Sequence, residues 1–164
     1  MSGLVIYIMG VSGSGKTTIG RKLSQKTGIP FFDGDDFHSK ENKEKMQSGK
    51  ALNDDDRKNW LEAIHAAAIK NSNEKGAIIA CSALKAKYRA TLSHDIEPLV
   101  RWVFLNGSYE SIAERMEHRK HHFMPESLLR SQFDILEVPV DAIEKDISDT
   151  PDEIVRDLII KLHI

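Results

Sequence analysis

The sequence has few of the features that mark secreted, membrane-embedded or nucleic-acid-binding proteins. Its one cysteine, Cys81, cannot form a disulfide within the chain. No apolar run approaches the roughly 20 residues that a membrane-spanning helix needs. The N-terminus lacks the charged, apolar and small-residue order of a signal peptide. These absences favour a reducing, cytoplasmic location with no membrane partner.

An excess of positive charge is also missing. Lys and Arg number 23 against 25 Asp and Glu, which gives a formal net charge of -2 and a pI near 6.4. General attraction to nucleic acid is therefore not expected, and an anionic ligand has to be met by individually placed cations. We expect a small-molecule substrate. The length of 164 residues fits a single domain over residues 1–164.

A glycine-rich motif follows the apolar segment that ends at Met9. Residues 10–17 read Gly-Val-Ser-Gly-Ser-Gly-Lys-Thr, which matches the P-loop pattern in every required position. Glycines there let the backbone turn its N–H groups toward a polyphosphate. Lys16 adds charge for the β and γ phosphates, and Thr17 can ligate Mg²⁺. We therefore predict ATP and Mg²⁺ as ligands, with nucleotide contacts from Gly10, Ser12, Gly13, Ser14, Gly15, Lys16, Thr17 and Thr18.

An acidic turn, Asp33-Gly34-Asp35-Asp36, follows the short apolar segment 31–32. Ligands of open α/β sheets bind beyond the carboxyl ends of the strands, so the turn is expected near the P-loop. Acidic turns are commonly just solvated loops. Carboxylates beside a polyphosphate would repel it, however, unless Mg²⁺ or a substrate hydroxyl stood between them. We favour the functional interpretation.

The apolar segment 77–81 reads as a buried strand and raises a question about the metal. Many P-loop enzymes carry an Asp at the end of this strand that helps to hold Mg²⁺, but here the position is occupied by Cys81 and Ser82. The missing carboxylate has to come from elsewhere, and Asp33 and Asp35 are the obvious donors. Cys81 is expected to be an ordinary buried thiol.

Strand-like and helix-like segments alternate along the chain. This alternation predicts an α/β fold with a doubly wound, mainly parallel sheet of about five strands. Expected helix starts include Asn53 or Asp54, Ser108, and Thr150 with Pro151 behind it. Trp60 is expected in the core rather than as a stacking platform. The expected strands are 4–9, 31–32, 77–81, 99–105 and 142–147.

Cations are concentrated in residues 115–125, ahead of a break at Pro125. A basic helix end is often only compensation for the helix dipole. A kinase also needs cations over the transferring phosphoryl group and a cover that excludes water, so we favour a lid. The histidines in this stretch lack Cys or Asp partners at convincing spacing, and a zinc site is not expected.

Four further segments, read with the P-loop, carry a resemblance to a known family. They are Asp33-Gly34-Asp35, Asn53-Asp54-Asp55-Asp56-Arg57-x-x-Trp60-Leu61, Cys81-Ser82-Ala83-Leu84-Lys85-x-x-Tyr88-Arg89 and Ser131-Gln132-Phe133-x-x-Leu136-Glu137. From about Val5 to Pro139 the chain resembles the gluconokinases of the shikimate-kinase-like group. The resemblance implies transfer of the γ-phosphoryl of ATP to the 6-hydroxyl of D-gluconate.

The same resemblance implies a three-layer P-loop NTPase fold with strand order 2-3-1-4-5 and helices on both faces. It also implies a mobile lid at about 119–127, a substrate-binding helical region at about 38–60, and a homodimer. His121 departs from the family, in which Gly is common at this position. This departure bears on the geometry of the lid.

Individual roles carried over by resemblance complete the expected site. Asp35 would orient and deprotonate the acceptor hydroxyl, while Asp33 would support through water the metal that Thr17 can ligate. Arg115 would contact the nucleotide and Arg119 the transferring phosphoryl group. The expected catalytic residues are Lys16, Asp35 and Arg119, and the expected substrate-binding residues are Asp35, His38, Arg57, Lys85, His122 and Gln132. Of these, Arg57 and Lys85 are suited to the gluconate carboxylate and its hydroxyls.

Two alternatives stay open at this point. A kinase of shikimate or another polyol also needs an acidic turn and substrate cations. A nucleotide-dependent switch would bind ATP without transferring a phosphoryl group. Turnover of candidate acceptors distinguishes all three hypotheses.

Overall fold

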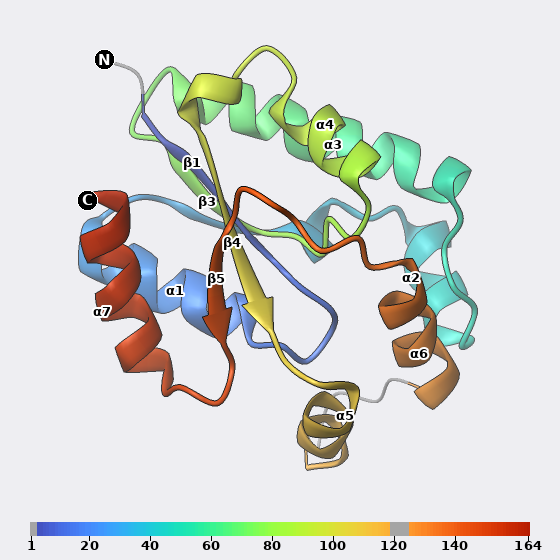
Figure 1. Ribbon diagram of the computed structural model, residues 1–164. Coiled ribbons are helices and arrows are strands. Elements are labelled where there is room, and N and C mark those ends of the chain that lie inside the picture. Colours follow the sequence, from blue (N-terminus) through green and yellow to red (C-terminus); the bar gives the residue numbers. More distant parts are fainter. Residues whose placement is uncertain (1–2, 119–124) are drawn as a thin grey trace.

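The computed structural model describes residues 3–118 and 125–164. Its centre is a parallel five-stranded sheet in the order β2-β3-β1-β4-β5 (Figure 1). The α/β class, the parallel pairing and the strand order are all as predicted. The strands are β1 (Val5–Met9), β2 (Phe31–Asp33), β3 (Ala77–Ala80), β4 (Val100–Asn106) and β5 (Ile143–Asp146).

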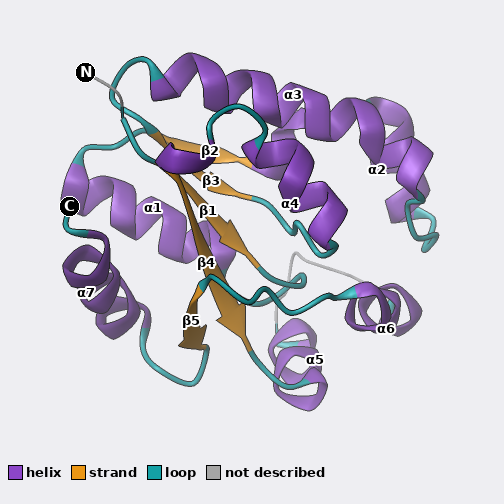
Figure 2. Cartoon of the chain, turned by 45° about the horizontal axis from the view of Figure 1, so that its top comes forward, coloured by secondary structure: helices purple, strands orange, loops and turns teal. Residues whose placement is uncertain are grey.

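Helices cover both faces of the sheet and so form three layers (Figure 2). Helices α3 and α4 lie over one face, α1 and α7 lie over the other, and α2, α5 and α6 lie toward the end of the sheet where the P-loop is found. The helices are α1 (Lys16–Thr27), α2 (Lys40–Gln47), α3 (Asp54–Ser72), α4 (Ala86–Ser93), α5 (Tyr109–Glu117), α6 (Glu126–Ile135) and α7 (Pro151–Leu162), with 3-10 turns at Gly34–Phe37 and Glu97–Leu99.

The central strand β1 divides the hydrophobic core into two parts. Ile6 and Ile8 pack into the cluster beneath α1 and α7, whereas Val5, Tyr7 and Met9 pack into the cluster beneath α3 and α4. All five side chains are fully buried. A strand covered on both faces reads as a continuous apolar run, which is why the segment was recognisable from sequence.

The helix caps follow the sequence signals. Asn53 begins α3 with a capping box to Asp56, Ser108 begins α5, and Thr150 begins α7 with Pro151 in its first turn. Gly28 ends α1 with a φ of 78°, in the left-handed region that glycine tolerates. These caps fix the residues at which the helices begin or end.

The acidic segment differs in detail from the expected turn. Asp33 is the last residue of β2, and Gly34–Phe37 forms a 3-10 helix whose first turn is capped by the Asp33 carboxylate. A Cβ on Gly34 would lie 2.4 Å from the carbonyl oxygen of Ala80. Glycine is therefore required where this helix passes the end of β3.

Part of the expected lid falls outside the description. Residues 119–124, with the site candidates Arg119 and His122, lie outside the described residues, while 125–127 lead into α6. None of the helices that the structure describes is long and apolar enough to span a membrane. The single-domain assignment stays a prediction.

Candidate active site

A cavity of about 370 Å³ opens beyond the carboxyl ends of β1, β2 and β3. The P-loop supplies one side of its lining, including Lys16 and Thr17, and the acidic segment supplies Asp33 and Asp35. Further lining comes from helices α2, α3 and α6, from the loop after α2, and from the end of β3. The cavity therefore lies beyond the carboxyl ends of the strands, as the sequence predicted, and the glycine-rich and acidic segments both face it.

The P-loop has the strained backbone that its glycines allow. Gly10, Gly13 and Gly15 have φ values of 152°, 82° and 98°, which side chains with a Cβ rarely adopt. Lys16 Nζ donates hydrogen bonds to the carbonyl oxygens of Gly10 and Val11, each at 2.9 Å. The ammonium group is thus held across the loop, at the place where a polyphosphate would lie.

The predicted magnesium ligands meet directly. Thr17 Oγ1 lies 3.2 Å from Asp33 Oδ2, and the other oxygen of Asp33 accepts the N–H of Asp35 at 3.0 Å. A hydroxyl and a carboxylate fit Mg²⁺, which typically takes one or two protein oxygens and completes its octahedron with phosphates and water. Within the described ranges no group of three or more His, Cys, Asp or Glu could hold a metal.

Cys81 and Ser82 also line the cavity, at the end of β3. Burial raises the pKa of the Cys81 thiol to about 12, despite the nearby charge of Lys16. The thiol is therefore protonated at neutral pH, as expected for an inert buried cysteine. Asp33 supplies a carboxylate that this strand end lacks.

On the side of the cavity away from the P-loop, His38 stacks on Trp60. Their ring centroids are 4.3 Å apart with an interplanar angle of 10°. Burial, followed by the charges of Arg57 and Lys43, lowers the His38 pKa to about 4. His38 is thus a neutral imidazole at physiological pH, able to accept or donate one hydrogen bond at each nitrogen according to its tautomer.

Trp60 is a core residue, as predicted from the sequence. Its side chain is buried, at 3% exposure, and its Nε1 donates to the carbonyl of Gly34 at 2.8 Å. The stack of its ring on His38 was not predicted. Trp60 ties α3 to the 3-10 helix that carries Asp35.

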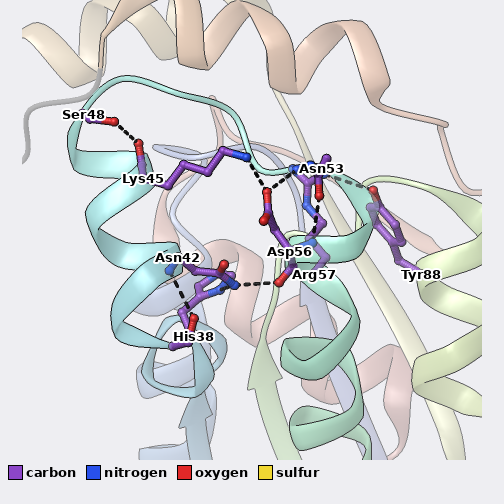
Figure 3. Close-up of polar contacts among 9 residues, drawn as sticks. His38, Asn42, Lys45, Ser48, Asn53, Asp56, Arg57 and Tyr88 are labelled. Carbon is purple, nitrogen blue, oxygen red and sulfur yellow. Dashed lines mark hydrogen bonds and ion pairs between the residues drawn. The ribbon is translucent and has the colours of Figure 1, made fainter.

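The two predicted carboxylate-binding cations lie along one wall. Arg57 lines both the main cavity and an adjoining cavity of about 190 Å³, whereas Lys85 lines the smaller one. Lys85 Nζ lies 3.3 Å from Asp54 Oδ1. The guanidinium of Arg57 points toward Tyr88 (Figure 3). The main cavity therefore adjoins a second, smaller compartment that both cations line, called the cationic compartment below.

Gln132 joins α6 to the P-loop. Its Oε1 accepts the Ser12 N–H at 2.7 Å, and its Nε2 donates to Ser12 Oγ at 3.1 Å. Both contacts are to the donor loop rather than to the cationic compartment, although Gln132 also lines the main cavity. Gln132 therefore lies at the P-loop side of the main cavity.

Arg115 lies away from the main cavity. Its Nη2 donates to the carbonyl oxygen of Ile147, in the turn that follows β5. This contact anchors α5 to the turn before α7. The nucleotide role of Arg115 stays a prediction, as do the roles of all the candidate site residues.

Sequence reasoning missed several residues of the acceptor wall. Lys43 lines the main cavity from α2. Asp54 lines the smaller cavity and pairs with Lys85, whereas Tyr88 bonds to Arg57 from outside both linings. Tyr88 belongs to a motif already noted in the sequence, but its partners are 31 and 34 residues distant. Nothing local in the sequence pairs them.

The strand order, the P-loop and an acceptor cavity beside it define a P-loop kinase that acts on a small molecule. A family model described as "Shikimate kinase" matches residues 12–161.

Similar proteins of known name show which family within this class the chain belongs to. A probable gluconokinase of Dictyostelium discoideum is 46% identical over 94% of this chain and 84% of its own length. The thermosensitive gluconokinase of Escherichia coli K12 is 46% identical over 90% of this chain and 78% of its own. A crystal structure of a gluconokinase from Sinorhizobium meliloti 1021 matches with a TM-score of 0.87 and 41% identity, over 98% of this chain and 91% of that one. The chain belongs to the gluconokinase family.

Proposed function

We propose that this protein phosphorylates D-gluconate at its 6-hydroxyl, using ATP and releasing 6-phospho-D-gluconate and ADP. One observation carries the proposal. The P-loop, Asp35 and the cation Arg57 line a single cavity, so a phosphoryl donor, a base and a carboxylate-binding group face one another. Relatives named gluconokinase support the choice of acceptor.

The donor end would hold the nucleotide through P-loop N–H groups and Lys16. Thr17 would ligate Mg²⁺ and Asp33 would support the ion through water. The bound ion would neutralise charge on the phosphates. Gln132 would keep Ser12 in place beside the transferring group, because it holds both the N–H and the hydroxyl of that residue.

The acceptor end would orient the sugar acid. Arg57 presents a planar fork that matches a carboxylate, and neutral His38 can hydrogen-bond a sugar hydroxyl. Asp35 would accept the proton of the 6-hydroxyl. The hydroxyl oxygen would form a bond to the γ-phosphorus while the bond between that phosphorus and the β,γ-bridging oxygen breaks. Arg115, Arg119 and His122 would complete the contacts when the lid at 119–127 covers the site. We also propose a cytoplasmic location and a homodimer.

A panel of acceptors tests this function. Purified protein with ATP and Mg²⁺ is offered D-gluconate, other aldonates, shikimate and uncharged polyols, and ADP formation is measured for each. We expect the highest kcat/KM with D-gluconate. Turnover of shikimate without turnover of gluconate would point to a different kinase, and unchanged ATP with every acceptor would point to a nucleotide switch.

A further inference from the structure

A buried tyrosine joins the two cations of the acceptor wall. Tyr88 lies in α4 with 3% of its surface exposed. Arg57 Nη1 donates to the Tyr88 hydroxyl at 3.1 Å (Figure 3), and the guanidinium carbon lies 5.3 Å from the ring centroid. Lys85 Nζ lies 5.6 Å from the same centroid. One aromatic ring therefore contacts both groups that were predicted to bind the carboxylate.

The hydroxyl hydrogen of Tyr88 is committed to a third residue. Tyr88 donates to Asp54 Oδ1 at 2.5 Å. Hydrogen bonds from Lys87, Tyr88 and Lys85 hold the pKa of Asp54 well below its usual range, so this carboxylate is ionised and can only accept. Burial and the Asp54 contact raise the pKa of Tyr88, which therefore keeps its proton. The lone pairs of the hydroxyl oxygen are left for Arg57.

We propose that Tyr88 is a positioning residue that aims Arg57 at the carboxylate of the acceptor, an inference that rests on the proposed function. Arg57 lines both cavities, whereas Tyr88 is not among the described residues that line either one. Tyr88 therefore acts through Arg57. The hydroxyl occupies one guanidinium N–H and leaves the others for a carboxylate. An arginine fixed in advance loses less conformational freedom when the acceptor binds.

The chain contains a matched control cluster. On α5, the Tyr109 hydroxyl donates to Glu126 Oε1 at 3.1 Å, and the Arg130 guanidinium carbon lies 4.5 Å from the Tyr109 ring centroid. This cluster has the same three kinds of side chain but lies on the surface between α5 and α6, outside the lining of both cavities. Removing its hydroxyl tests the general cost of losing a tyrosine–carboxylate contact.

The first experiment compares Tyr88→Phe with Tyr109→Phe. Both variants keep the ring, so the contact of Lys85 with the Tyr88 ring is retained. For Tyr88→Phe we expect the KM for gluconate to rise roughly three- to tenfold, the range that the loss of one hydrogen bond permits. Its kcat and its KM for ATP should stay within about twofold of wild type. Tyr109→Phe should change none of these values, and thermal melting checks that both variants fold.

A double-mutant cycle separates positioning from a structural role. Arg57→Ala alone should raise the KM for gluconate tenfold or more, because it removes a charge-assisted contact. Adding Tyr88→Phe to Arg57→Ala should produce no further rise, because the residue through which Tyr88 acts is gone. Effects that multiply in the double variant, or an unchanged KM in Tyr88→Phe, would overturn the proposal.

A second variant keeps the test valid if Tyr88→Phe fails to fold. Asp54→Ala removes a half-exposed side chain and frees the hydroxyl hydrogen of Tyr88. Its effect through charge should be similar with and without Arg57, so the orienting effect is the difference between the two backgrounds. We expect the ratio of the variant's KM for gluconate to that of its matched parent to be higher when Arg57 is present than when it is Ala; equal ratios in both backgrounds would refute the proposal. Wild-type protein that fails to phosphorylate gluconate would instead refute the proposed function.

Discussion

The two sides of the active site are built in different ways. The donor side is a continuous segment, residues 10–17, whose lysine bonds to carbonyls five and six residues away. The acceptor side is assembled from the 3-10 helix at Gly34–Phe37 and from helices α2, α3 and α4. Its central contacts, those of Tyr88, join residues 31 and 34 positions apart. A local motif fixes the first, whereas only the packed fold fixes the second. Substitutions should therefore separate nucleotide chemistry from acceptor binding.

Lys16→Ala should give the largest effect and should be confined to the donor side. Loss of the cation that faces the β and γ phosphates is expected to lower kcat by roughly 10²- to 10³-fold, comparable to removal of a group that stabilises charge in the transition state. The dissociation constant for gluconate, measured by calorimetry, should stay near the wild-type value. Lys22→Ala removes a half-exposed lysine of the same helix that pairs with Asp152, and should keep wild-type turnover. Weak gluconate binding in Lys16→Ala would show that the two sides are not separable.

Asp35→Asn tests the residue at the junction of the two sides. If Asp35 is the base, kcat should fall by roughly 10²-fold or more, while the affinities for ATP and for gluconate change little. Asp36→Asn is the matched control, because Asp36 is the exposed neighbour on the same 3-10 helix. Near-normal turnover of Asp35→Asn in a steady-state assay would remove this residue from the role of base.

The contrast between local and distant contacts also explains how far the sequence could be read. The strand–loop–helix context of the P-loop, the helix caps and the buried strands each depend on neighbouring residues, and these predictions were confirmed in the fold. His38 on Trp60 and Arg57 on Tyr88 depend on how α3 packs against neighbouring segments. The sequence identified His38 and Arg57 through resemblance, yet it could not supply their supports because residue spacing carries no information on such packing.

Gln132→Ala should give a smaller effect that reaches both sides. Gln132 and Ser12 are 120 residues apart in sequence and share two hydrogen bonds. Their loss frees the Ser12 N–H and hydroxyl, and we expect about a three- to tenfold fall in kcat/KM for both ATP and gluconate. Arg130→Ala alters the exposed Arg130 of the same helix, and should leave both values unchanged. An effect on gluconate alone would return Gln132 to a purely substrate-binding role.

His38, on the acceptor side, should give the smallest effect, visible as a change in the pH dependence of stability. Burial is the main cause that lowers its pKa to about 4 from an ordinary value of 6.5. Between these two values the unfolded chain binds a proton that the folded chain does not, so the contribution of His38 to stability is complete above pH 6.5 and declines as the pH falls toward 4. An NMR titration of the imidazole, assigned by the signal lost in His38→Asn, should show no protonation from pH 8 to 5.5. The unfolding free energy of His38→Asn should fall less steeply than that of wild type over pH 6.5 to 4.

An NMR titration midpoint near 6.5 would mean that the stack on Trp60 leaves His38 open to water. The acceptor side would then be less tightly packed than its contacts indicate.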